Sequence, residues 1–315
     1  MKRCCVIGGT GFLGQYVVEE LLGRGMGVTV VGRKKINDSR LPKQVKYYST
    51  DYGDVGLMKA VLKGIDWVFC LAHTSYPASS YLNPVNEINN NVTPMVSLLN
   101  LIPQTAVQKI VYVSSGGAVY GKADKFPLTE DMPTNPLSPY GTSKLTIEKN
   151  ALNFYQLYKV PIVVVRPGNA YGPFQNPFRG QGFIPAVMGR VLLNMPIELF
   201  GRNGTVRDYL YVTDVAKGII AAAEKGKVGR IYNLGSGQGY NNRQILKFLL
   251  PLTKRDGFKM KVNILPKRDF DVPINYLDSS LLRNDTGWKS SMPIEKGIEL
   301  TWNWYKSNMH LYANE

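Results

Sequence analysis

A strict alternation of short apolar runs with helical patterns over the first 168 residues most constrains what this chain can fold into. Runs rich in Val, Ile, Cys and aromatic residues predict strands at 3–9, 27–32, 45–50, 66–73, 109–115 and 161–168. Apolar residues at helical spacing between them predict helices at 12–25, 54–64, 84–102 and 141–158. Strands that are apolar on both faces and alternate with helices form parallel sheets covered on both sides. We therefore predict an α/β fold with a doubly wound parallel sheet.

A glycine-rich turn, VIGGTGFLG, joins the first predicted strand to the first predicted helix. Glycines in such a turn allow close approach of a phosphate to the free N–H groups of the helix N-terminus. An ordinary turn is the alternative, but a strand before and a helix after the turn favour a Rossmann-type pyrophosphate site. The expected cofactor contacts here are Gly8, Gly11, Phe12, Leu13 and Gly14.

The second predicted strand ends in the basic run GRKK, residues 32–35, where an acidic residue would receive a free ribose 2′-hydroxyl. Arg33 could instead receive a 2′-phosphate, which favours NADP over NAD. The alternative is that these side chains point to solvent and NAD binds regardless. Asp51, after the third strand, is an expected adenine contact or a loop cap.

The composition and the pattern of predicted elements change after residue 168, where Gly, Pro and Asn become frequent and short strands are mixed with helices. We predict a dinucleotide-binding domain over 1–168, to which part of 206–235 returns. Residues 169–315 are expected to form mainly a smaller substrate-binding lobe.

Composition limits the function classes. The formal charge of +15 is spread along the chain without a block of five like charges, so we expect steering of a phosphate-bearing small molecule and no nucleic-acid binding. A weak association with an anionic surface stays open. Cys4, Cys5 and Cys70 lie in apolar runs and predict reduced, buried thiols in a cytoplasmic protein. No apolar run reaches the ~18 residues of a membrane span, and the distant His73 and His310 predict no metal site.

The segment SPYGTSKLTIEK, residues 138–149, places Tyr140 and Lys144 one helical turn apart on the same face of a predicted helix. A nearby ammonium group and the positive end of a helix both stabilise a phenolate, so we expect a lowered pKa for Tyr140. Such a tyrosine could exchange protons near neutral pH. The pattern is common by itself, but here it follows a glycine loop and a strand that ends in SSGG, residues 114–117.

Five motifs in order, the glycine loop, SSGGAVYG (114–121), PYGTSK (139–144), RPGNAYG (166–172) and VRDYLYVTD (206–214), carry a resemblance to a known family. The chain resembles the extended short-chain dehydrogenase/reductase family over nearly its whole length. It is most similar to the nucleotide-sugar epimerases and dehydratases, such as UDP-glucose 4-epimerase.

The resemblance implies that Tyr140 takes the proton of a sugar hydroxyl while hydride moves to a nicotinamide, and that Lys144 holds the cofactor ribose. The family's third catalytic residue, a Ser or Thr, would fall on Gly116, so Ser115 is expected to replace it. Alternatively, Ser115 only caps the strand end or water takes its place. Further expected cofactor contacts are Leu71, Ala72, Asn91 and Pro167.

The resemblance also implies a nucleotide-diphosphate site. Its expected substrate contacts are Ser115, Gly116, Asn169, Arg207, Arg268 and Asp271, and Asn275 is expected to leave room in the sugar pocket. The 4,6-dehydratases of the family carry an acidic pair where this chain has Gly117 and Ala118, which argues against dehydration.

Three functions follow. The first is a 4-epimerase of a nucleotide sugar, with a UDP-hexose expected. The second is an NADPH-dependent 4-ketoreductase of a dTDP-, GDP- or UDP-linked deoxysugar. The third is a non-catalytic NADP sensor, against which the intact Tyr140–Lys144 pair argues. Family members are often dimers through helices near the tyrosine, so the resemblance implies a homodimer.

Overall fold

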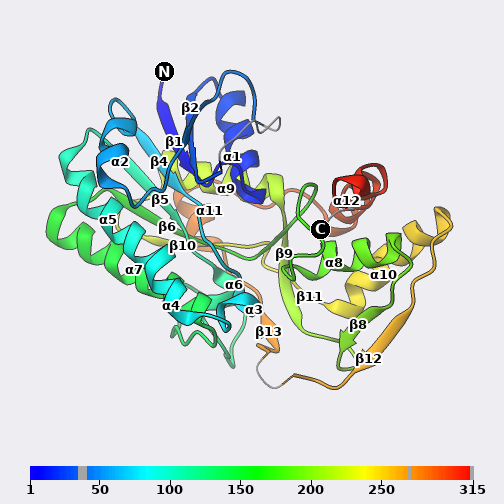
Figure 1. Cartoon of the computed structure of the whole chain (residues 1–315). Coiled ribbons are helices and arrows are strands. Elements are labelled where there is room, and N and C mark those ends of the chain that lie inside the picture. The colour runs from blue at the N-terminus through cyan, green and yellow to red at the C-terminus, as the bar shows by residue number, and fades with distance from the viewer. Residues whose placement is uncertain (35–40, 269–270, 313–315) are drawn as a thin grey trace.

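The computed structural model describes residues 1–34, 41–268 and 271–312. It forms two lobes, with the larger lobe on the left of Figure 1 and the smaller on the right. The larger lobe is built on a seven-stranded sheet in the order β10-β6-β5-β4-β1-β2-β3, and all of its strand pairs are parallel. Its strands are β1 (Arg3–Ile7), β2 (Gly27–Gly32), β3 (Lys46–Ser49), β4 (Trp67–Cys70), β5 (Lys109–Val113), β6 (Ile162–Pro167) and β10 (Ile231–Leu234).

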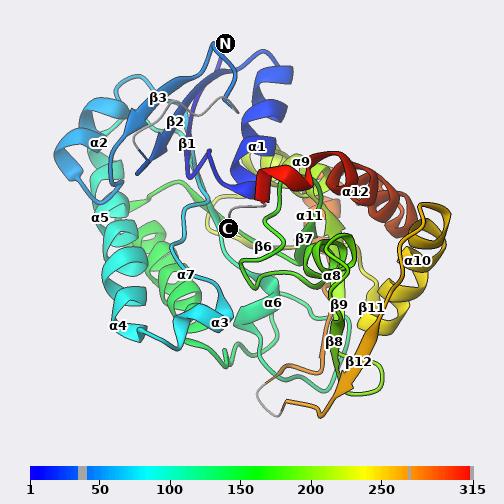
Figure 2. The same cartoon turned by 45° about the vertical axis from the view of Figure 1, so that its right-hand side comes forward.

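The central strands carry no polar face because helices cover the sheet on both sides. Every residue of β4 and of β6 is buried. On one face, α1 (Phe12–Gly23), α9 (Val212–Lys225) and α11 (Ser280–Thr286) supply Val17, Leu21, Ile219 and Leu282 to one apolar cluster. On the other, α2 (Val55–Val61), α5 (Thr93–Leu101) and α7 (Pro139–Tyr158) form a second cluster (Figure 2). The predicted α/β fold with a doubly wound parallel sheet is therefore confirmed.

The predicted helix over 84–102 is not a uniform α-helix. It runs as α4 (Pro84–Glu87), a π-helical turn η1 (Ile88–Val92), α5 and a 3₁₀ turn η2 (Ile102–Gln104). Pro94 lacks a backbone N–H, so a regular α-helical bond is missing near the junction. Short helices α3 (Pro77–Ser80) and α6 (Gly116–Val119) lie after β4 and β5.

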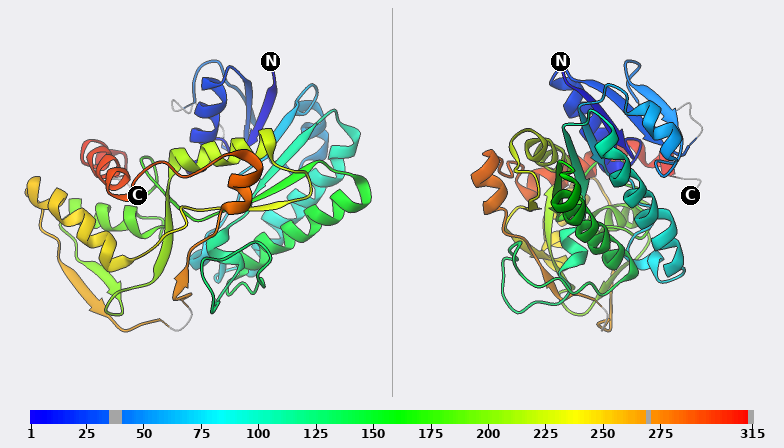
Figure 3. Two further views of the ribbon diagram at one scale, coloured as in Figure 1. Left: turned by 180° about the vertical axis from the view of Figure 1, so that it is seen from behind. Right: turned by 90° about the vertical axis from the view of Figure 1, so that its left-hand side faces the viewer.

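The smaller lobe gathers segments from the second half of the chain (Figure 3). Strands β7 (Asn169–Tyr171), β9 (Val206–Tyr211), β11 (Gly239–Asn241) and β13 (Ile274–Asn275) form one sheet, and β8 (Ile197–Phe200) pairs with β12 (Val262–Leu265). Helices α8 (Phe183–Leu192), α10 (Asn242–Arg255) and α12 (Ile294–Asn308), followed by η3 (Met309–Tyr312), pack around Trp302. Between these segments the chain returns to the larger lobe to form α9 and β10.

None of the helices in the described ranges combines the length and the apolar character needed to cross a bilayer.

Candidate active site

The glycine loop between β1 and α1 is closely packed and leaves the start of the helix uncovered. Gly8 has φ = 84°, and a Cβ there would lie 2.7 Å from the backbone nitrogen of Ala72. A Cβ on Gly14 would lie 2.1 Å from the carbonyl oxygen of Gly8. Gly11 stands at the N-cap position of α1 and has no side chain that could accept from the first N–H groups of the helix. The first turn contains no acidic residue. Backbone N–H groups at an uncapped helix start fit the pyrophosphate of a dinucleotide.

Leu71 lies at the same edge of the sheet, next to the glycine loop, because its N–H donates to the carbonyl of Ile7 at 2.9 Å. Phe12 and Leu13 form the first turn of α1, and Pro167 is buried at the end of β6. The structure thus places these expected cofactor contacts at the carboxyl ends of neighbouring parallel strands, where α/β folds bind their ligands.

The end of β2 carries exposed basic side chains. Arg33 and Lys34 are exposed, and Lys35, the last residue of the basic run, lies outside the described residues. Asp51 is exposed, and its carboxylate accepts a hydrogen bond from the N–H of Gly53 at 2.8 Å. This bond is that of a loop cap, and the adenine contact of Asp51 stays a prediction.

Tyr140 and Lys144 lie side by side on the buried face of α7, as predicted from their spacing. The helix begins at Pro139, and the Ser138 hydroxyl caps it by accepting from the N–H of Gly141 at 3.1 Å. Lys144 Nζ donates to the carbonyl of Val113 at 2.9 Å and lies 5.8 Å from the centre of the Tyr140 ring. The ammonium group is thereby fixed between the end of β5 and the phenol.

The predicted lowering of the Tyr140 pKa is wrong in this structure. Burial raises the pKa of Tyr140 to about 12; a hydrogen bond with the Ser115 side chain opposes this rise, and the charge of Glu87 adds to it. Burial also lowers the pKa of Lys144 to about 8, against the opposing charges of Glu148 and Glu87. The sequence argument counted the neighbouring ammonium group and omitted the desolvation of the phenolate, which is the larger effect.

Ser115 follows β5, and its side chain lies close enough to Tyr140 to act on the pKa of the phenol, which it lowers. Gly116, on which the resemblance would place the hydroxyl, has no room for a side chain. A Cβ there would lie 2.6 Å from Leu277 Cδ1 and 3.0 Å from the carbonyl oxygen of Arg166. The structure therefore brings a hydroxyl to the phenol from the position before the expected one.

Three of the expected substrate contacts gather in the smaller lobe. Arg268 forms an ion pair with Asp271 at 2.9 Å, and its guanidinium group lies 4.0 Å from the centre of the Phe200 ring. The charges of Asp271 and Arg268 both act on Arg207 in β9, while burial lowers the pKa of Arg207. A cationic group set against an aromatic ring and beside a carboxylate can bind both a phosphate and a ribose hydroxyl.

The other expected contacts lie in different surroundings. Asn169 begins β7, and its Oδ1 would be 3.4 Å from a Cβ on Gly117, close to Ser115. Asn91 uses both polar atoms of its side chain on protein groups, the N–H of Thr74 and the carboxylate of Glu87. The expectation that Asn275 leaves room in the sugar pocket stays a prediction. That side chain is fully buried and donates to the carbonyl of Gly116 at 3.0 Å.

The sequence argument missed two buried carboxylates near the site. Glu87 accepts hydrogen bonds beneath Tyr140, and Glu148 pairs with Arg166. The available signal for Glu87 was an acidic residue one helical turn before Asn91 in the asparagine-rich segment 83–91. Among the described residues, no group of three His, Cys, Asp or Glu side chains is arranged to hold a metal ion.

Comparisons with known proteins agree with this geometry. The family described as "NAD dependent epimerase/dehydratase family" matches residues 4–235. UDP-glucose 4-epimerase of Lactobacillus helveticus is 31% identical over 337 residues, covering 99% of this chain and 100% of that protein.

Two solved structures share the whole fold. UDP-glucose 4-epimerase of Thermotoga maritima, solved with UDP-glucose, superposes with a TM-score of 0.91 at 30% identity and covers 98% of this chain and 99% of its own. UDP-glucose 4-epimerase of Thermus thermophilus, solved with NAD, gives a TM-score of 0.88 at 31% identity, with 96% and 99% covered.

Proposed function

The chain belongs to the NAD dependent epimerase/dehydratase family, a family of enzymes, and from that premise we propose that it is a nucleotide-sugar 4-epimerase acting on a UDP-hexose. The observation that carries the proposal is that Ser115, Tyr140 and Lys144 lie close together at the carboxyl end of β5. The glycine loop lies at the same end of the parallel strands. The relatives named for UDP-glucose 4-epimerization support the choice of substrate class.

Each residue of the site would have its own role in the reaction. A bound nicotinamide dinucleotide supplies the hydride acceptor and donor. Tyr140 would act as the phenolate, the form that the neighbouring Lys144 ammonium group stabilises. It would accept the proton of the C4 hydroxyl as that carbon is oxidised and return it when the carbon is reduced on its other face. Lys144, fixed by Val113, is placed to bind a ribose hydroxyl of the cofactor. Ser115, next to Tyr140, would hold the C4 oxygen beside the phenol.

The absence of carboxylates next to Ser115 supports epimerization over dehydration. Gly117 and Ala118 occupy the start of α6, and neither can donate or accept a proton through a side chain. Expulsion of water from C5 and C6 needs an acid and a base at the sugar. The 4-keto sugar would therefore be reduced again without loss of water.

Arg207, Arg268 and Asp271 are proposed to bind the nucleotide diphosphate. Arg207 would bind phosphate oxygens with its planar guanidinium group, and Asp271 would accept from ribose hydroxyls. The ring of Phe200, already in contact with the Arg268 guanidinium group, offers a flat surface for the base.

The basic residues at the end of β2 favour a second candidate function. Arg33 is exposed, and the neighbouring Gly32 and Lys34 provide no carboxylate for a free ribose 2′-hydroxyl. A preference for NADP would suit an NADPH-dependent 4-ketoreductase of a nucleotide deoxysugar, which needs the same tyrosine.

We infer that the protein is a homodimer in either case, which the exposed Leu82, Val85 and Ile88 near α7 support. We also infer that it is cytoplasmic, which its three free, buried thiols support.

The test is incubation of the purified protein with UDP- and dTDP-hexoses, with and without added NADPH, followed by chromatography of the sugars. An epimerase converts one C4 epimer into the other with no net change in nicotinamide absorbance. A ketoreductase consumes one NADPH per product from a 4-keto sugar. Turnover of neither kind, in a protein that binds the dinucleotide, would overturn the proposal.

A further inference from the structure

The carboxylate of Glu87 is buried under the proposed active site and is used by none of the roles given above. It accepts hydrogen bonds from His73 Nε2 at 3.2 Å, Asn91 Nδ2 at 3.2 Å and Ser143 Oγ at 3.0 Å. The residue is only 3% exposed. A buried carboxylate is costly unless several donors satisfy it, and here the donors come from the loop after β4, from η1 and from α7.

The local backbone places this carboxylate next to the start of α7. Glu87 ends α4, and the π-helical turn η1 follows it directly. Single π-turns inside helices are rare and are frequent at functional sites. Ser143, one residue before Lys144, also lies 2.9 Å from the carbonyl of Tyr140. Its single hydroxyl proton is therefore shared between Glu87 and the backbone of the catalytic helix.

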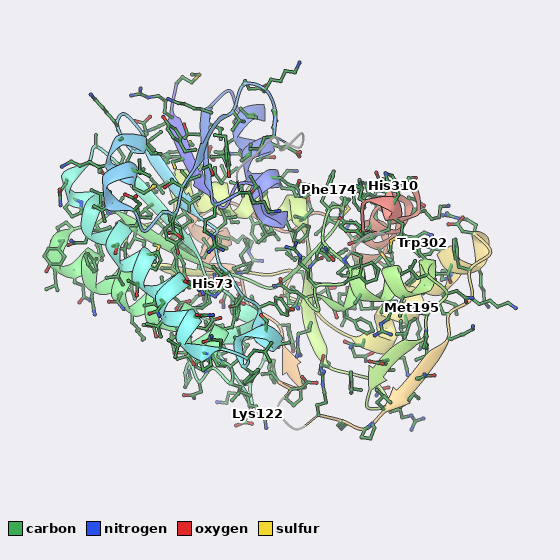
Figure 4. The ribbon with its side chains drawn as sticks, viewed as in Figure 1. His73, Lys122, Phe174, Met195, Trp302 and His310 are labelled. Carbon is green, nitrogen blue, oxygen red and sulfur yellow. The ribbon has the colours of Figure 1, made fainter. Side chains whose placement is uncertain are left out.

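His73 connects Glu87 to the phenol. Its ring contacts the Tyr140 ring edge to face, with centroids 4.8 Å apart and planes at 81°. Figure 4 shows His73 in the larger lobe, beside the helical segment of α4 and α5. Donation from Nε2 to Glu87 leaves Nδ1 as the acceptor nitrogen of a neutral ring, and this buried atom has no hydrogen-bond partner among the described residues. Most buried side-chain polar atoms in proteins have a hydrogen-bond partner, so the unpaired Nδ1 calls for an explanation.

We propose that Glu87 and His73 form a positioning pair for Tyr140, in which the carboxylate holds the imidazole against the phenol ring and places a fixed negative charge beneath it. This inference rests on the proposed function of Tyr140 as the proton-transfer group. Neither residue of the pair contacts the sugar in this scheme. They act through the orientation and ionisation of the phenol.

The electrostatic surroundings of the pair agree with this role. Burial and the Lys144 ammonium group lower the pKa of His73 to about 4, against the opposing effect of Glu87, so the ring is neutral at pH 7. Burial acts to raise the pKa of Glu87, but hydrogen bonds from His73 and Ser143 hold it down at about 2. Among the other titratable groups, Lys144 of α7 acts on His73, and Glu148 of α7 and Cys70 of β4 act on Lys144. Tyr140 in turn acts on Tyr112 of β5.

Three variants separate positioning from packing. Glu87→Gln keeps the shape and removes the charge. His73→Phe keeps an aromatic edge and loses the bond to Glu87, whereas His73→Gln keeps a donor at the place of Nε2 and loses the ring. We expect kcat to fall about tenfold or more in the two His73 variants with KM changed less, because small misplacements of a reacting group are costly. Glu295→Gln and His310→Phe, both at exposed positions, are the matched controls and should leave kcat unchanged.

The pH dependence gives a readout that a packing role would not move. Because the Glu87 charge raises the pKa of Tyr140, Glu87→Gln should shift the phenol ionisation to lower pH. The titration is followed by NMR of protein labelled with ¹³Cζ-tyrosine, and the Tyr140 signal is assigned by its loss in Tyr140→Phe. This measurement needs no substrate, so it tests the pair even if the proposed epimerase activity is absent.

The outcomes are distinct. A lower phenol pKa in Glu87→Gln, with reduced kcat in the His73 variants and unchanged dinucleotide affinity, supports the pair. An unmoved tyrosine titration, or variants that lose only thermal stability while kcat and its pH profile match the wild type, would overturn it. Should Glu87→Gln fail to fold, His73→Phe and Ser143→Ala provide the same test, because each removes one hydrogen bond of the carboxylate.

Discussion

Arg166 of β6 and Glu148 of α7 form an ion pair in the interior of the larger lobe, with Arg166 Nη2 2.6 Å from Glu148 Oε2 and Nε 3.0 Å from Oε1. The Glu148 side chain is fully buried, and that of Arg166 is 3% exposed. Arg166 Nη1 donates to the Tyr120 hydroxyl, which donates to Asn233 of β10 at 2.7 Å. The pair therefore holds the helix that carries Tyr140 to two strands of the sheet.

Removal of one partner of this pair should destabilise the protein strongly. Glu148→Gln leaves a buried guanidinium group without its counter-charge, and we expect a loss of about 3–5 kcal/mol in urea denaturation. The double variant Glu148→Leu with Arg166→Met should recover much of the loss, since apolar replacements of both partners are often tolerated. A single variant as stable as Glu295→Gln, an exposed control, would contradict this account.

The glycine loop should tolerate no side chain at residue 14. Gly14→Ala places a methyl group 2.1 Å from the Gly8 carbonyl, so the loop must shift and dinucleotide affinity should fall at least ~10-fold, about 1.4 kcal/mol. Gly23→Ala in the same helix meets open space and should leave the affinity unchanged while stabilising the chain by about 0.5–1 kcal/mol. Isothermal titration with NAD and NADP measures the first effect and urea denaturation the second.

Stability should decrease in mild acid because of His73. Burial lowers the pKa of His73 from the ordinary 6.5 to about 4, so the unfolded chain binds the proton more readily than the folded one. This contribution is complete above pH 6.5 and is lost as the pH falls from 6.5 to 4. Between pH 7 and pH 5 it amounts to about 2 kcal/mol. His73→Gln should lose this part of the pH dependence in urea denaturation, and His310→Gln should keep it.

Arg33 should decide the choice between the two dinucleotides. Arg33→Ala removes the exposed cation at the end of β2. We expect the affinity for NADP to fall ~10-fold relative to NAD, since a charge-assisted bond to a phosphate contributes about 1.5–3 kcal/mol. The control is Lys63→Ala, which removes another exposed cation. Lys63 precedes β4 and therefore lies at the amino ends of the strands, away from the carboxyl ends where Arg33 lies. Equal loss of both affinities would show that Arg33 contacts no 2′-phosphate.

Tyr140→Phe should remove turnover and leave binding intact. Loss of a positioned proton-transfer group costs ~10²–10⁴ in kcat, whereas the retained ring still packs against His73. Ser115→Ala should lower kcat less and leave KM near the wild-type value. Tyr158→Phe, an exposed tyrosine at the other end of the same helix, should be neutral. Sugar conversion and fluorescence titration of the dinucleotide measure the two effects.

The sequence predicted the larger lobe well because its determinants are local. Fully apolar runs that alternate with helical patterns are typical of buried strands. The observed strands fall inside the predicted ranges, and most are shorter at one or both ends. The spacing of Tyr140 and Lys144 and the position of the glycine loop also depend only on neighbours in the chain. These features could therefore be read without knowledge of the fold.

The prediction that failed depends on long-range packing. The pKa direction of Tyr140 follows from its burial beneath segments distant in sequence. The bond of Asn275 to Gly116, across 159 residues, could not be predicted from the sequence either. The role of Glu87 could not be read either, because its donors lie on three separate elements. No pattern within a short window of sequence carries that information.

Residues 231–234, far along the chain, form β10 and cover β6 at one border of the parallel sheet. A shortened protein that stopped at residue 168 would keep the six preceding strands but would expose the unpaired backbone of β6, a run of Val and Ile. Such an edge is a template for aggregation. The first half of the chain is therefore unsuited to recombinant production as an independent cofactor-binding fragment, and efforts to isolate that activity should retain residues to at least 235.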